Sequence, residues 1–486
     1  MTAGAPPPWA EAKQHEQHFS LITGANSGVG LAIGQRLVDD FLNTRSPSSH
    51  LVVVVTTRSV AKSRATLLAL RKHLEATVSS PKISTRLSGC LDAPYRPVSA
   101  LRRVHLLSIQ LDLCDLENIY GLADTLVNGV ISNPPEIPAT KYSYPPYSAV
   151  RLSRIDSVIL NAGIGGWTSL DWFGMVRMLC RSGLTETTTF PDYKISAVGK
   201  TTRGLKTRPT GADPASGKTV LGEVFMANVF GHYVFAHEIL PLLTRMDGSD
   251  DVTPRHARII WQSSIEAMGY HLDPSDLQGL KAREPYESTK RLTDVLALTS
   301  NLPSVQRRCQ SYFAPPPRAD GSRVRPVKMY VAHPGIVVTT IFPLHWFLMF
   351  WYRFIMYVVR WVGSPWHTVV GYAAAVASVW LALESDSILD ETRADRSKWG
   401  SACDRMGIDC CKRTEVMGWG WEGKVQDSTN ETDREKRRIL RRDLGRWSGS
   451  KDVTKEKLQE FKVLGADCWS EMESLRLEWD ARVKGA

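Results

Sequence analysis

The sequence lacks a disulfide framework. Its eight cysteines in 486 residues contain no CxxC pair and follow no regular spacing, whereas small secreted domains depend on paired cysteines. Nothing at the N-terminus has the charged and apolar regions of a secretory signal. We therefore expect free thiols in a reducing compartment. Cys403, Cys410 and Cys411 cluster, but their spacing matches no common zinc site, so no metal is expected.

The sequence also lacks a compact basic stripe. Its 60 Lys and Arg against 50 Asp and Glu give a formal net charge of +10, yet these cations are scattered beside many acids. We therefore expect no nucleic-acid partner. A membrane surface or a phosphate-bearing cofactor explains the excess equally well. A hydrophobic content of 43% with 23% charged residues is that of a folded protein.

Apolar runs alternate with segments of helical spacing. Residues 51–55 form a continuous β-branched run, as in a parallel strand covered on both faces. Further strands are predicted at 19–23, 104–111, 157–160, 257–262 and 327–332, and helices at 30–41, 224–243 and 286–298. This alternation predicts an α/β fold, a Rossmann-type doubly wound parallel sheet.

The segments around these elements divide the chain into four parts. A polar N-terminal arm (1–18) precedes a dinucleotide-binding core (19–340), and a charged, partly helical C-terminal tail (384–486) shows no recognisable chemistry. The core carries insertions at 79–99, 132–148 and 167–217. We expect the first two, rich in Pro and Ser, to be surface loops, and the third to be a partly ordered lid.

From Ile341 the chain becomes apolar and aromatic. Residues 341–362 are interrupted only by a proline, a histidine and two arginines, Arg353 and Arg360. A spanning helix needs about 20 apolar residues, but arginines at mid-bilayer are costly. We favour a surface-lying or re-entrant anchor; a true span, a buried helix or a dimer interface are the alternatives. Residues 367–383 are expected to pack in the core, which makes 341–383 a membrane-associating and core-completing segment.

A glycine-rich turn follows the first predicted strand. Gly24, Gly28 and Gly30 lie between that strand and the first helix, where backbone amides and the helix N-terminus favour a pyrophosphate. The turn residues Thr23, Asn26 and Ser27 are assigned to the same site. After the second strand come Arg58 and Lys62, with no acid. Because a cation suits the 2′-phosphate of NADP, we predict NADPH as the cofactor.

A candidate proton-transfer pair lies farther along the chain. Tyr286 and Lys290 are one helical turn apart, so an ammonium group can lie near the phenol. The positive charge would lower the phenol pKa from about 10 and let it serve as an acid near neutrality. The pair follows a strand that ends in Ser263-Ser264, downstream of the glycine turn.

These motifs, in this order, resemble the short-chain dehydrogenase/reductase family. The resemblance also rests on Asp112-Leu113, Asn161-Ala162-Gly163, Asn228 and Pro334-Gly335. It implies that Tyr286 gives the proton, Lys290 binds the nicotinamide ribose, Ser264 binds the substrate carbonyl and Asn228 holds a water against the lysine. It further places Asp112 near the adenine, and Asn161, Gly163, Pro334, Gly335 and Thr339 along the cofactor.

The sequence departs from the family at one point. The gap between Ser264 and Tyr286 is longer than usual, so Ser263 remains a competitor for the role of the serine. His232 and Glu266, near the motifs, are expected to be structural or lid residues rather than catalysts.

A narrower resemblance is to the fungal 3-ketosteroid reductases of sterol C4-demethylation. It rests on residues 161–167 and the insertion after them, the helix GEVFMANVFGHYVF, WQSSIEA and the aromatic stretch after Pro334-Gly335. It implies NADPH-dependent reduction of a sterol 3-ketone to the 3β-alcohol in ergosterol biosynthesis. It also implies an endoplasmic-reticulum and lipid-droplet location with the catalytic domain facing the cytosol, and association with the other C4-demethylation enzymes and oxidosqualene cyclase.

Two alternatives stay open at this point. The motifs are compatible with a reductase for another lipid-like ketone, such as a retinoid, a fatty acyl ketone or a polyketide. A cofactor-binding scaffold for a sterol-synthesis complex is the other alternative. The complete set of Asn228, Ser264, Tyr286 and Lys290 argues against a pure scaffold, since such a protein has no reason to keep all four.

Overall fold

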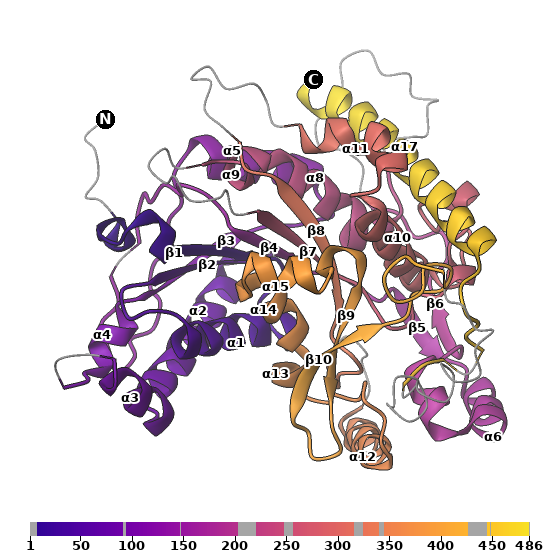
Figure 1. Ribbon diagram of the computed structural model, residues 1–486, viewed down its shortest axis with the longest axis horizontal. Coiled ribbons are helices and arrows are strands. Elements are labelled where there is room, and N and C mark those ends of the chain that lie inside the picture. The colour runs from indigo at the N-terminus through magenta and orange to yellow at the C-terminus, as the bar shows by residue number, and fades with distance from the viewer. Residues whose placement is uncertain are drawn as a thin grey trace.

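The computed structural model describes residues 7–90, 94–145, 147–202, 220–246, 256–314, 324–339, 345–425, 445–447 and 449–485. Within these residues, eight strands form one sheet in the order β10-β9-β8-β7-β4-β1-β2-β3 (Figure 1). The strands are β1 Gln17–Ile22, β2 His50–Thr57, β3 Val104–Gln110, β4 Ser157–Leu160, β7 Ala257–Gln262, β8 Val327–His333, β9 Lys398–Cys403 and β10 Asp409–Thr414. The predicted apolar runs correspond to β1, β2, β3, β4, β7 and β8.

The chain winds outward from the centre of this sheet in two directions. It passes from β1 to β2 and β3, returns to β4 on the other side of β1, and continues through β7, β8 and β9, all parallel. The edge strand β10 alone is antiparallel to its neighbour. This topology confirms the expected α/β, Rossmann-type doubly wound sheet. In such sheets ligands bind beyond the carboxyl ends of the strands.

Both faces of the sheet are covered at β2, which is why this strand contains a continuous apolar run. Along β2, Val52 and Val54 join one hydrophobic core, and Leu51, Val53 and Val55 join the other. Side chains of a strand point alternately to its two faces, so a strand buried on both sides has no polar alternation. The continuous run of residues 51–55 therefore reflects a central position in the sheet.

One core packs under α1 Gly28–Thr44, α2 Val60–Val78, α13 Gly371–Ala374 and α14 Val376–Leu383. The opposite core packs under α5 Leu116–Asn128, α8 Gly231–Glu238, α9 Leu240–Leu243, α10 Pro285–Thr299, α11 Pro303–Phe313 and α17 Lys455–Lys484 (Figure 1). The predicted helix 224–243 is divided into α7 Glu223–Phe225, a π-helical turn at Met226–Phe230, α8 and α9. Most residues of α14 are buried in the first of these cores.

The C-terminal part is built into this core, which differs from the expected appended tail. β9 extends the parallel sheet beside β8, and α17 packs along α10 and α11. The hydrophobic helix α12 Trp346–Val362 therefore lies inside the crossover between two parallel strands. The sequence did not indicate this, because β9, with the sequence KWGSAC, has none of the β-branched residues that mark the predicted strands.

The predicted insertions are partly regular. Residues 79–99 hold α3 Pro81–Ser88 and the start of α4 Pro97–Leu101, with Ile83 and Leu87 buried, so this segment is not a simple surface loop. The third insertion forms β5 Trp167–Leu170, α6 Trp172–Thr189 and β6 Lys194–Ser196, with β5 and β6 paired as an antiparallel hairpin. Parts of the predicted segments, 1–6, 91–93, 146, 203–217, 340–344, 426–444 and 486, lie outside the described residues.

Among the described residues, no helix combines the length and apolarity that crossing a bilayer requires.

Candidate active site

The glycine turn joins β1 to α1 and is fixed by residues from β4. Thr23 is fully buried, and its hydroxyl oxygen accepts hydrogen bonds from the backbone N–H groups of Asn161 and Ala162 at 2.9 and 3.1 Å. The Asn161 side-chain amide donates to the Thr23 carbonyl at 3.0 Å. Thr23 and Asn161 therefore hold the turn in place by contacts within the protein. Asn26 and Ser27, whose side chains hydrogen-bond each other at 3.1 Å, lie at the start of α1.

At Gly24 and Gly30 of the turn, any side chain would collide with neighbouring atoms of the protein. A Cβ at Gly30 would lie 2.3 Å from the Gly24 carbonyl oxygen. Gly24 itself has φ of +66°, and a Cβ there would lie 2.7 Å from that of Ala162. These glycines thus let the turn fold closely on itself and against the chain after β4, and the N–H groups and dipole at the N-terminus of α1 favour a pyrophosphate. The residues present fit the phosphates of a dinucleotide.

Two cations lie where the adenosine ribose is expected. Arg58 directly follows β2, and Lys62 lies in the first turn of α2; both side chains are exposed. Asp112 follows β3, and its carboxylate accepts from the backbone N–H of Cys114 at 3.0 Å, which shapes the neighbouring loop. Arg58, Lys62 and Asp112 are thus placed on one side of the glycine turn, after neighbouring strands.

Tyr286, Lys290 and Ser264 come together beyond the carboxyl end of β7. The Lys290 Nζ lies 5.5 Å from the centre of the Tyr286 ring and donates a hydrogen bond to the Gln262 carbonyl at 2.7 Å. Ser264 lies close enough to Tyr286 to affect the proton affinity of its hydroxyl. The Ser263 hydroxyl instead donates to the Lys290 carbonyl at 3.3 Å. The geometry therefore favours Ser264 over Ser263 as the serine of the site.

Burial changes the proton affinity of both groups. It lowers the pKa of Lys290 to about 8, with Asp294 opposing and Lys398 adding to this effect. It raises the pKa of Tyr286 well above 10; Glu266 adds to the rise and Lys194 opposes it. The lowered phenol pKa expected from the nearby ammonium is therefore wrong: burial outweighs the cations, so Tyr286 is protonated near neutrality but is a weaker acid than an exposed phenol.

Asn228 lies in the π-helical turn and meets the other motifs. Its side chain accepts from the Ile164 N–H at 2.8 Å, donates to the Ile164 carbonyl at 3.0 Å and donates to Thr289 at 3.2 Å. A Cβ on Gly163 would lie 2.8 Å from the Asn228 Oδ1 and 3.9 Å from the Lys290 Nζ. The structure thus brings Asn228, Gly163 and Lys290 together. Such π-turns are frequent at functional sites.

The loop after β8 closes toward the glycine turn. Gly335 has φ of +71°, and a Cβ there would lie 2.4 Å from the Trp366 carbonyl oxygen. The Pro334 carbonyl accepts a hydrogen bond from Thr368 at 3.0 Å. Thr339 is 3.6 Å from the position of a Cβ on Gly28. Thr339 therefore lies beside the glycine turn, whereas Pro334 and Gly335 pack against Trp366 and Thr368.

His232 and Glu266 have different surroundings. The fully buried His232 is hydrogen-bonded to the Thr23 hydroxyl at 2.9 Å. Burial lowers its pKa to about 3, so it is neutral and supports the turn. Glu266 forms an ion pair with Lys194 of the inserted hairpin. Within the described residues, no group of three or more His, Cys, Asp or Glu is placed to hold a metal.

Lys398 and Asp294 support the site and were not found from sequence. The Lys398 Nζ donates to the Ser264 carbonyl at 2.6 Å and pairs with the Asp294 carboxylate at 2.6 Å, and all these groups are buried. Asp294 lies one helical turn after Lys290. The spacing of 286, 290 and 294 on one helix face was a signal for Asp294, but no motif marks Lys398.

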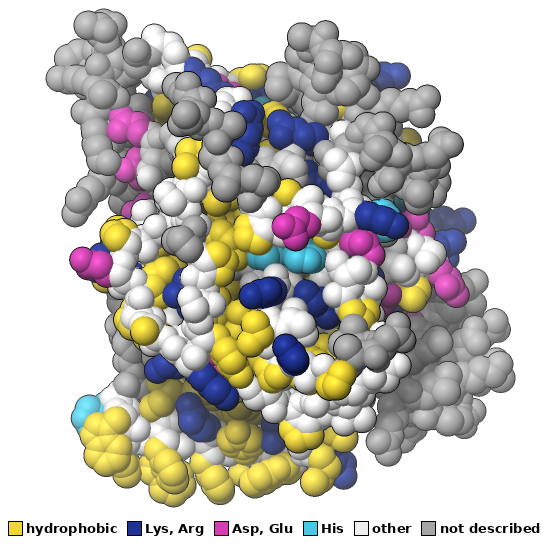
Figure 2. All heavy atoms as spheres, turned by 90° about the vertical axis from the view of Figure 1, so that its left-hand side faces the viewer, with side chains coloured by type: hydrophobic (Ala, Val, Ile, Leu, Met, Phe, Trp, Pro, Cys, Tyr) yellow, Lys and Arg dark blue, Asp and Glu magenta, His cyan; other side chains and the backbone are white. Residues whose placement is uncertain are grey.

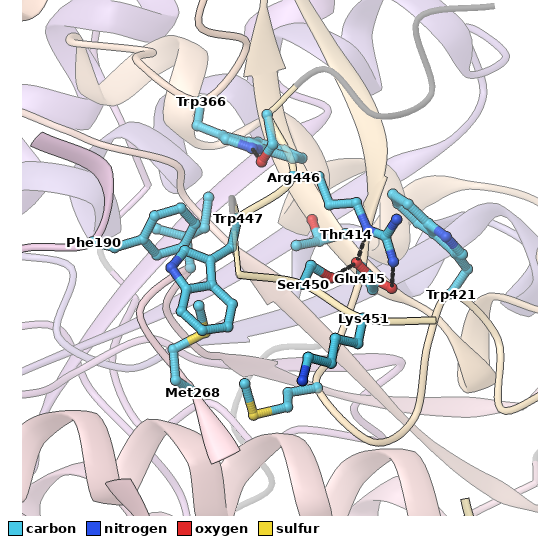
Figure 3. Close-up of a pocket in the computed structure, with 13 residues that line it drawn as sticks. Phe190, Met268, Trp366, Thr414, Glu415, Trp421, Arg446, Trp447, Ser450 and Lys451 are labelled. Carbon is cyan, nitrogen blue, oxygen red and sulfur yellow. Dashed lines mark hydrogen bonds and ion pairs between the residues drawn. The ribbon is translucent and has the colours of Figure 1, made fainter. Parts of the chain in front are cut away.

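A pocket lies beside the Ser264 loop (Figure 3). Ile265 and Met268, which follow the serine, line it together with Phe190 and residues of the C-terminal part. On its far wall the Arg446 guanidinium pairs with Glu415, with an Nη2–Oε1 distance of 2.7 Å (Figure 3). The other lining residues are Trp366, Thr414, Met417, Trp421, Gly445, Trp447, Ser450 and Lys451. The wall is largely aromatic and apolar.

The fold and these residues define a reductase of the short-chain dehydrogenase/reductase class. The glycine turn, Asn228, Ser264, Tyr286 and Lys290 meet at the carboxyl ends of the central strands. Their geometry can hold a dinucleotide and give a proton to a carbonyl oxygen.

Curated relatives narrow this class. The chain is 43% identical to the 3-keto-steroid reductase ERG27 of Gibberella zeae over 97% of this chain and 96% of that protein. It is 38% identical to the 3-keto-steroid reductase erg27 of Aspergillus fumigatus, with coverages of 95% and 94%. It is 27% identical to 3-keto-steroid reductase ERG27 of Saccharomyces cerevisiae, with coverages of 85% and 97%. The chain belongs to the 3-keto-steroid reductase family.

The other comparisons add little. No protein-family profile matches the chain. A 3-oxoacyl-[acyl-carrier protein] reductase from Brucella melitensis in complex with NAD is similar at 13% identity and a TM-score of 0.36, covering 75% of this chain and 89% of that one. An alcohol dehydrogenase from Thermococcus sibiricus complexed with 5-hydroxy-NADP matches at 16% and a TM-score of 0.30, with coverages of 67% and 78%. These similarities are too distant to indicate a cofactor or a substrate.

Proposed function

We propose that this protein reduces a sterol 3-ketone to the 3β-alcohol with NADPH, in the C4-demethylation steps of ergosterol biosynthesis. One observation carries the proposal: a chain 43% identical to a 3-keto-steroid reductase over nearly its whole length has Ser264, Tyr286, Lys290 and Asn228 assembled at one place. NADPH supplies the hydride when it is bound. Every other part of the reaction falls to side chains of this chain.

The residues divide the work as follows. Ser264 and Tyr286, which lie close together, bind the carbonyl oxygen of the substrate. Tyr286 gives its proton to that oxygen as the alcohol forms. Lys290 holds the nicotinamide ribose and keeps a positive charge near the phenol, and Asn228 positions a water that resupplies the proton. Phe190, Met268 and Trp447 offer apolar contacts to the sterol skeleton.

The preference for NADPH is supported by Arg58 and Lys62. Both cations are exposed at the start of α2, beside the end of β2, and no acid intervenes. Arg58 and Lys62 would pair with the 2′-phosphate, while the amides around Gly24, Gly28 and Gly30 would hold the pyrophosphate.

We further propose that the protein works on the surface of the endoplasmic-reticulum membrane and of lipid droplets, facing the cytosol, beside the other C4-demethylation enzymes and oxidosqualene cyclase. Support comes from α12, where Trp346 is 74% exposed and Phe350 63% exposed. The neighbouring α6 adds Phe173, 91% exposed. Figure 2 shows hydrophobic side chains gathered along the lower edge of the molecule, where α12 lies in Figure 1. The exposed cations Arg177, Arg181 and Arg353 lie on the same two helices, a composition that suits an anionic lipid surface.

The test is an assay of the purified, detergent-solubilised protein with a 3-keto sterol and NADPH. NADH and a non-steroid ketone serve as controls. Selective turnover of the sterol with NADPH is expected, and Tyr286→Phe should lower the rate about 10²- to 10⁴-fold. Turnover of the non-steroid ketone alone would discard the sterol. Unchanged activity of Tyr286→Phe would discard the proposed mechanism.

A further inference from the structure

A buried lysine of the inserted hairpin lies beside the proposed proton donor. Lys194 of β6 pairs with the carboxylate of Glu266, which follows the serine loop, and with that of Glu287 on α10, at 2.5 Å. The three side chains are 8%, 15% and 3% exposed, respectively. Taking three charges out of water is expensive, and an apolar plug would hold a hairpin at least as well. The cluster therefore calls for an explanation other than hairpin packing.

The cluster of Lys194, Glu266 and Glu287 lies close to Tyr286, which offers such an explanation. The Lys194 Nζ lies 5.7 Å from the centre of the Tyr286 ring and 4.4 Å from that of Trp167. The Trp167 and Tyr286 rings are in edge contact, with centres 4.9 Å apart. Tyr286 therefore lies near two ammonium groups, Lys290 of its own helix and Lys194 of the insertion.

The charges of the cluster act on the phenol in opposite directions. A nearby cation favours the phenolate and a nearby carboxylate disfavours it. Burial raises the pKa of Tyr286, Glu266 and Glu287 raise it further, and Lys194 lowers it. Burial also raises the pKa of Glu266 to about 7, which Lys194 opposes and Glu287 reinforces. The titratable groups around this cluster are Tyr193, which precedes β6, Tyr270, Glu284 with its partner His271, Tyr286, Lys290 and Tyr352.

We propose that Lys194 is a positioning residue for proton transfer, which sets the acidity of Tyr286 and is carried to the site by the β5–β6 hairpin. Glu266 and Glu287 hold Lys194 in place and limit its effect. The inference rests on the proposed reductase function, whatever ketone proves to be the substrate. It makes the insertion part of the reaction chemistry as well as a cover for the site.

The proposal predicts opposite effects for two substitutions. Lys194→Met removes the cation, which makes Tyr286 a weaker acid, so the rate of proton-coupled reduction should fall roughly ten-fold or more. Glu266→Gln removes one negative charge and preserves the shape, which makes Tyr286 a stronger acid. Its rate should rise about two- to five-fold. Damage to the fold would slow both variants.

The experiment measures single-turnover oxidation of NADPH by the full-length protein as a function of pH, using the ketone that the wild type reduces best. Lys200→Met is the matched control, because Lys200 follows the same hairpin and pairs with Glu223 at 2.7 Å while 59% exposed. The control should match the wild type. The pH at which the rate falls on the alkaline side should be higher in Lys194→Met and lower in Glu266→Gln than in the wild type.

The outcomes separate this inference from the proposed function. A wild type that reduces no ketone contradicts the proposed function itself. An active wild type whose two variants both slow down, or both stay unchanged, overturns the role of Lys194 alone. Thermal unfolding shows whether Lys194→Met is folded. If it is not, Glu266→Gln decides: a rate faster than that of the wild type supports the proposal, and an equal or slower rate rejects it.

Discussion

The pKa and the contacts of Lys290 in the folded protein could not be predicted from its sequence motif. It is 4% exposed, donates to the Gln262 carbonyl, and lies near Lys398 from a strand more than a hundred residues later. Burial lowers its pKa to about 8. Because the folded form releases its proton at lower pH than the unfolded chain, this group makes stability rise with pH from about 8 toward its ordinary value of about 10.4.

Cofactor binding is expected to weaken above pH 8. In the role proposed for Lys290, its ammonium group donates hydrogen bonds to the ribose below that pH, and a neutral amine binds less well above it. The NADPH dissociation constant should rise by up to about ten-fold per pH unit between 8 and 10. Fluorescence titration at several pH values measures this. In Lys290→Met the dependence should disappear, and a pH-independent constant in the wild type would contradict the assignment.

The cofactor preference is expected to depend on the pair of cations after β2. Arg58→Ala with Lys62→Ala removes the partners of the 2′-phosphate, so the KM for NADPH should rise about ten-fold or more while that for NADH stays unchanged. Steady-state kinetics with both cofactors measure the ratio. Lys72→Ala, an exposed lysine farther along the same helix, is the control. Equal changes for both cofactors would contradict the phosphate contact.

At the scale of elements, α10 holds the proposed proton-transfer pair and other elements contact it. Tyr286, Lys290 and Asp294 lie at successive helical turns on one face. β9 supplies Lys398, which pairs with Asp294 and holds the Ser264 carbonyl. The positions of Ser264 and Tyr286 thus depend on contacts with β9, a strand that no sequence motif indicates.

Lys398→Met is expected to lower the free energy of unfolding by about 3–5 kcal/mol, because it leaves Asp294 charged and buried without its partner. Lys398→Met combined with Asp294→Asn should recover much of the loss. Lys328→Met is the control: Lys328 pairs with Asp390 at 2.5 Å near the surface, and its loss should cost less than about 1 kcal/mol. Urea denaturation measures all three. Similar losses for Lys398→Met and Lys328→Met would contradict this account.

The exposed aromatic side chains of α12 are expected to bind lipid. Replacing Trp346, Phe350 and Trp351 by serine should reduce flotation with vesicles of zwitterionic and anionic phospholipids about ten-fold or more, since burying each ring in the interface contributes on the order of 1–2 kcal/mol. A triple serine variant at Val60, Val98 and Val130, which are exposed elsewhere on the molecule, is the control. Undiminished flotation of the α12 variant would reject this surface.

At the scale of the whole molecule, the C-terminal part closes the structure. α17 packs along α10 and α11, where Trp469 is fully buried and donates to the Leu296 carbonyl at 3.2 Å. Residues after β10 also form one wall of the pocket beside Ser264. N-terminal and C-terminal segments of the chain therefore both contribute to the surroundings of the site.

Trp469→Ala is expected to destabilise the fold by about 3–5 kcal/mol, because it opens a cavity under α10. Leu477→Ala on the same helix is the control, since Leu477 is 55% exposed and its loss should cost within about 0.5 kcal/mol. Thermal and urea unfolding measure both. A Trp469→Ala variant as stable as the wild type would show that the C-terminal helix is dispensable.

The sequence by itself determined the sheet of the nucleotide-binding half and the order of the motifs. β4 and β7 begin and end at the predicted residues, because strands buried on both faces must be continuously apolar. The glycine turn could also be predicted from the sequence, since only glycine fits at positions 24 and 30. These signals are local, within a few residues along the chain.

Only the tertiary structure decided which distant residues support the site. Lys398, Asp294 and Lys194 act through partners more than 70 residues away or across the sheet, and no spacing along the chain encodes such contacts. The choice of Ser264 over Ser263 likewise depends on which hydroxyl meets Tyr286. β9 and α17 join the core because neighbours cover them, although their own residues resemble a charged tail. Burial is a property of the assembled chain, so the sequence identified Tyr286 and Lys290 but not the directions in which burial changes their pKa values.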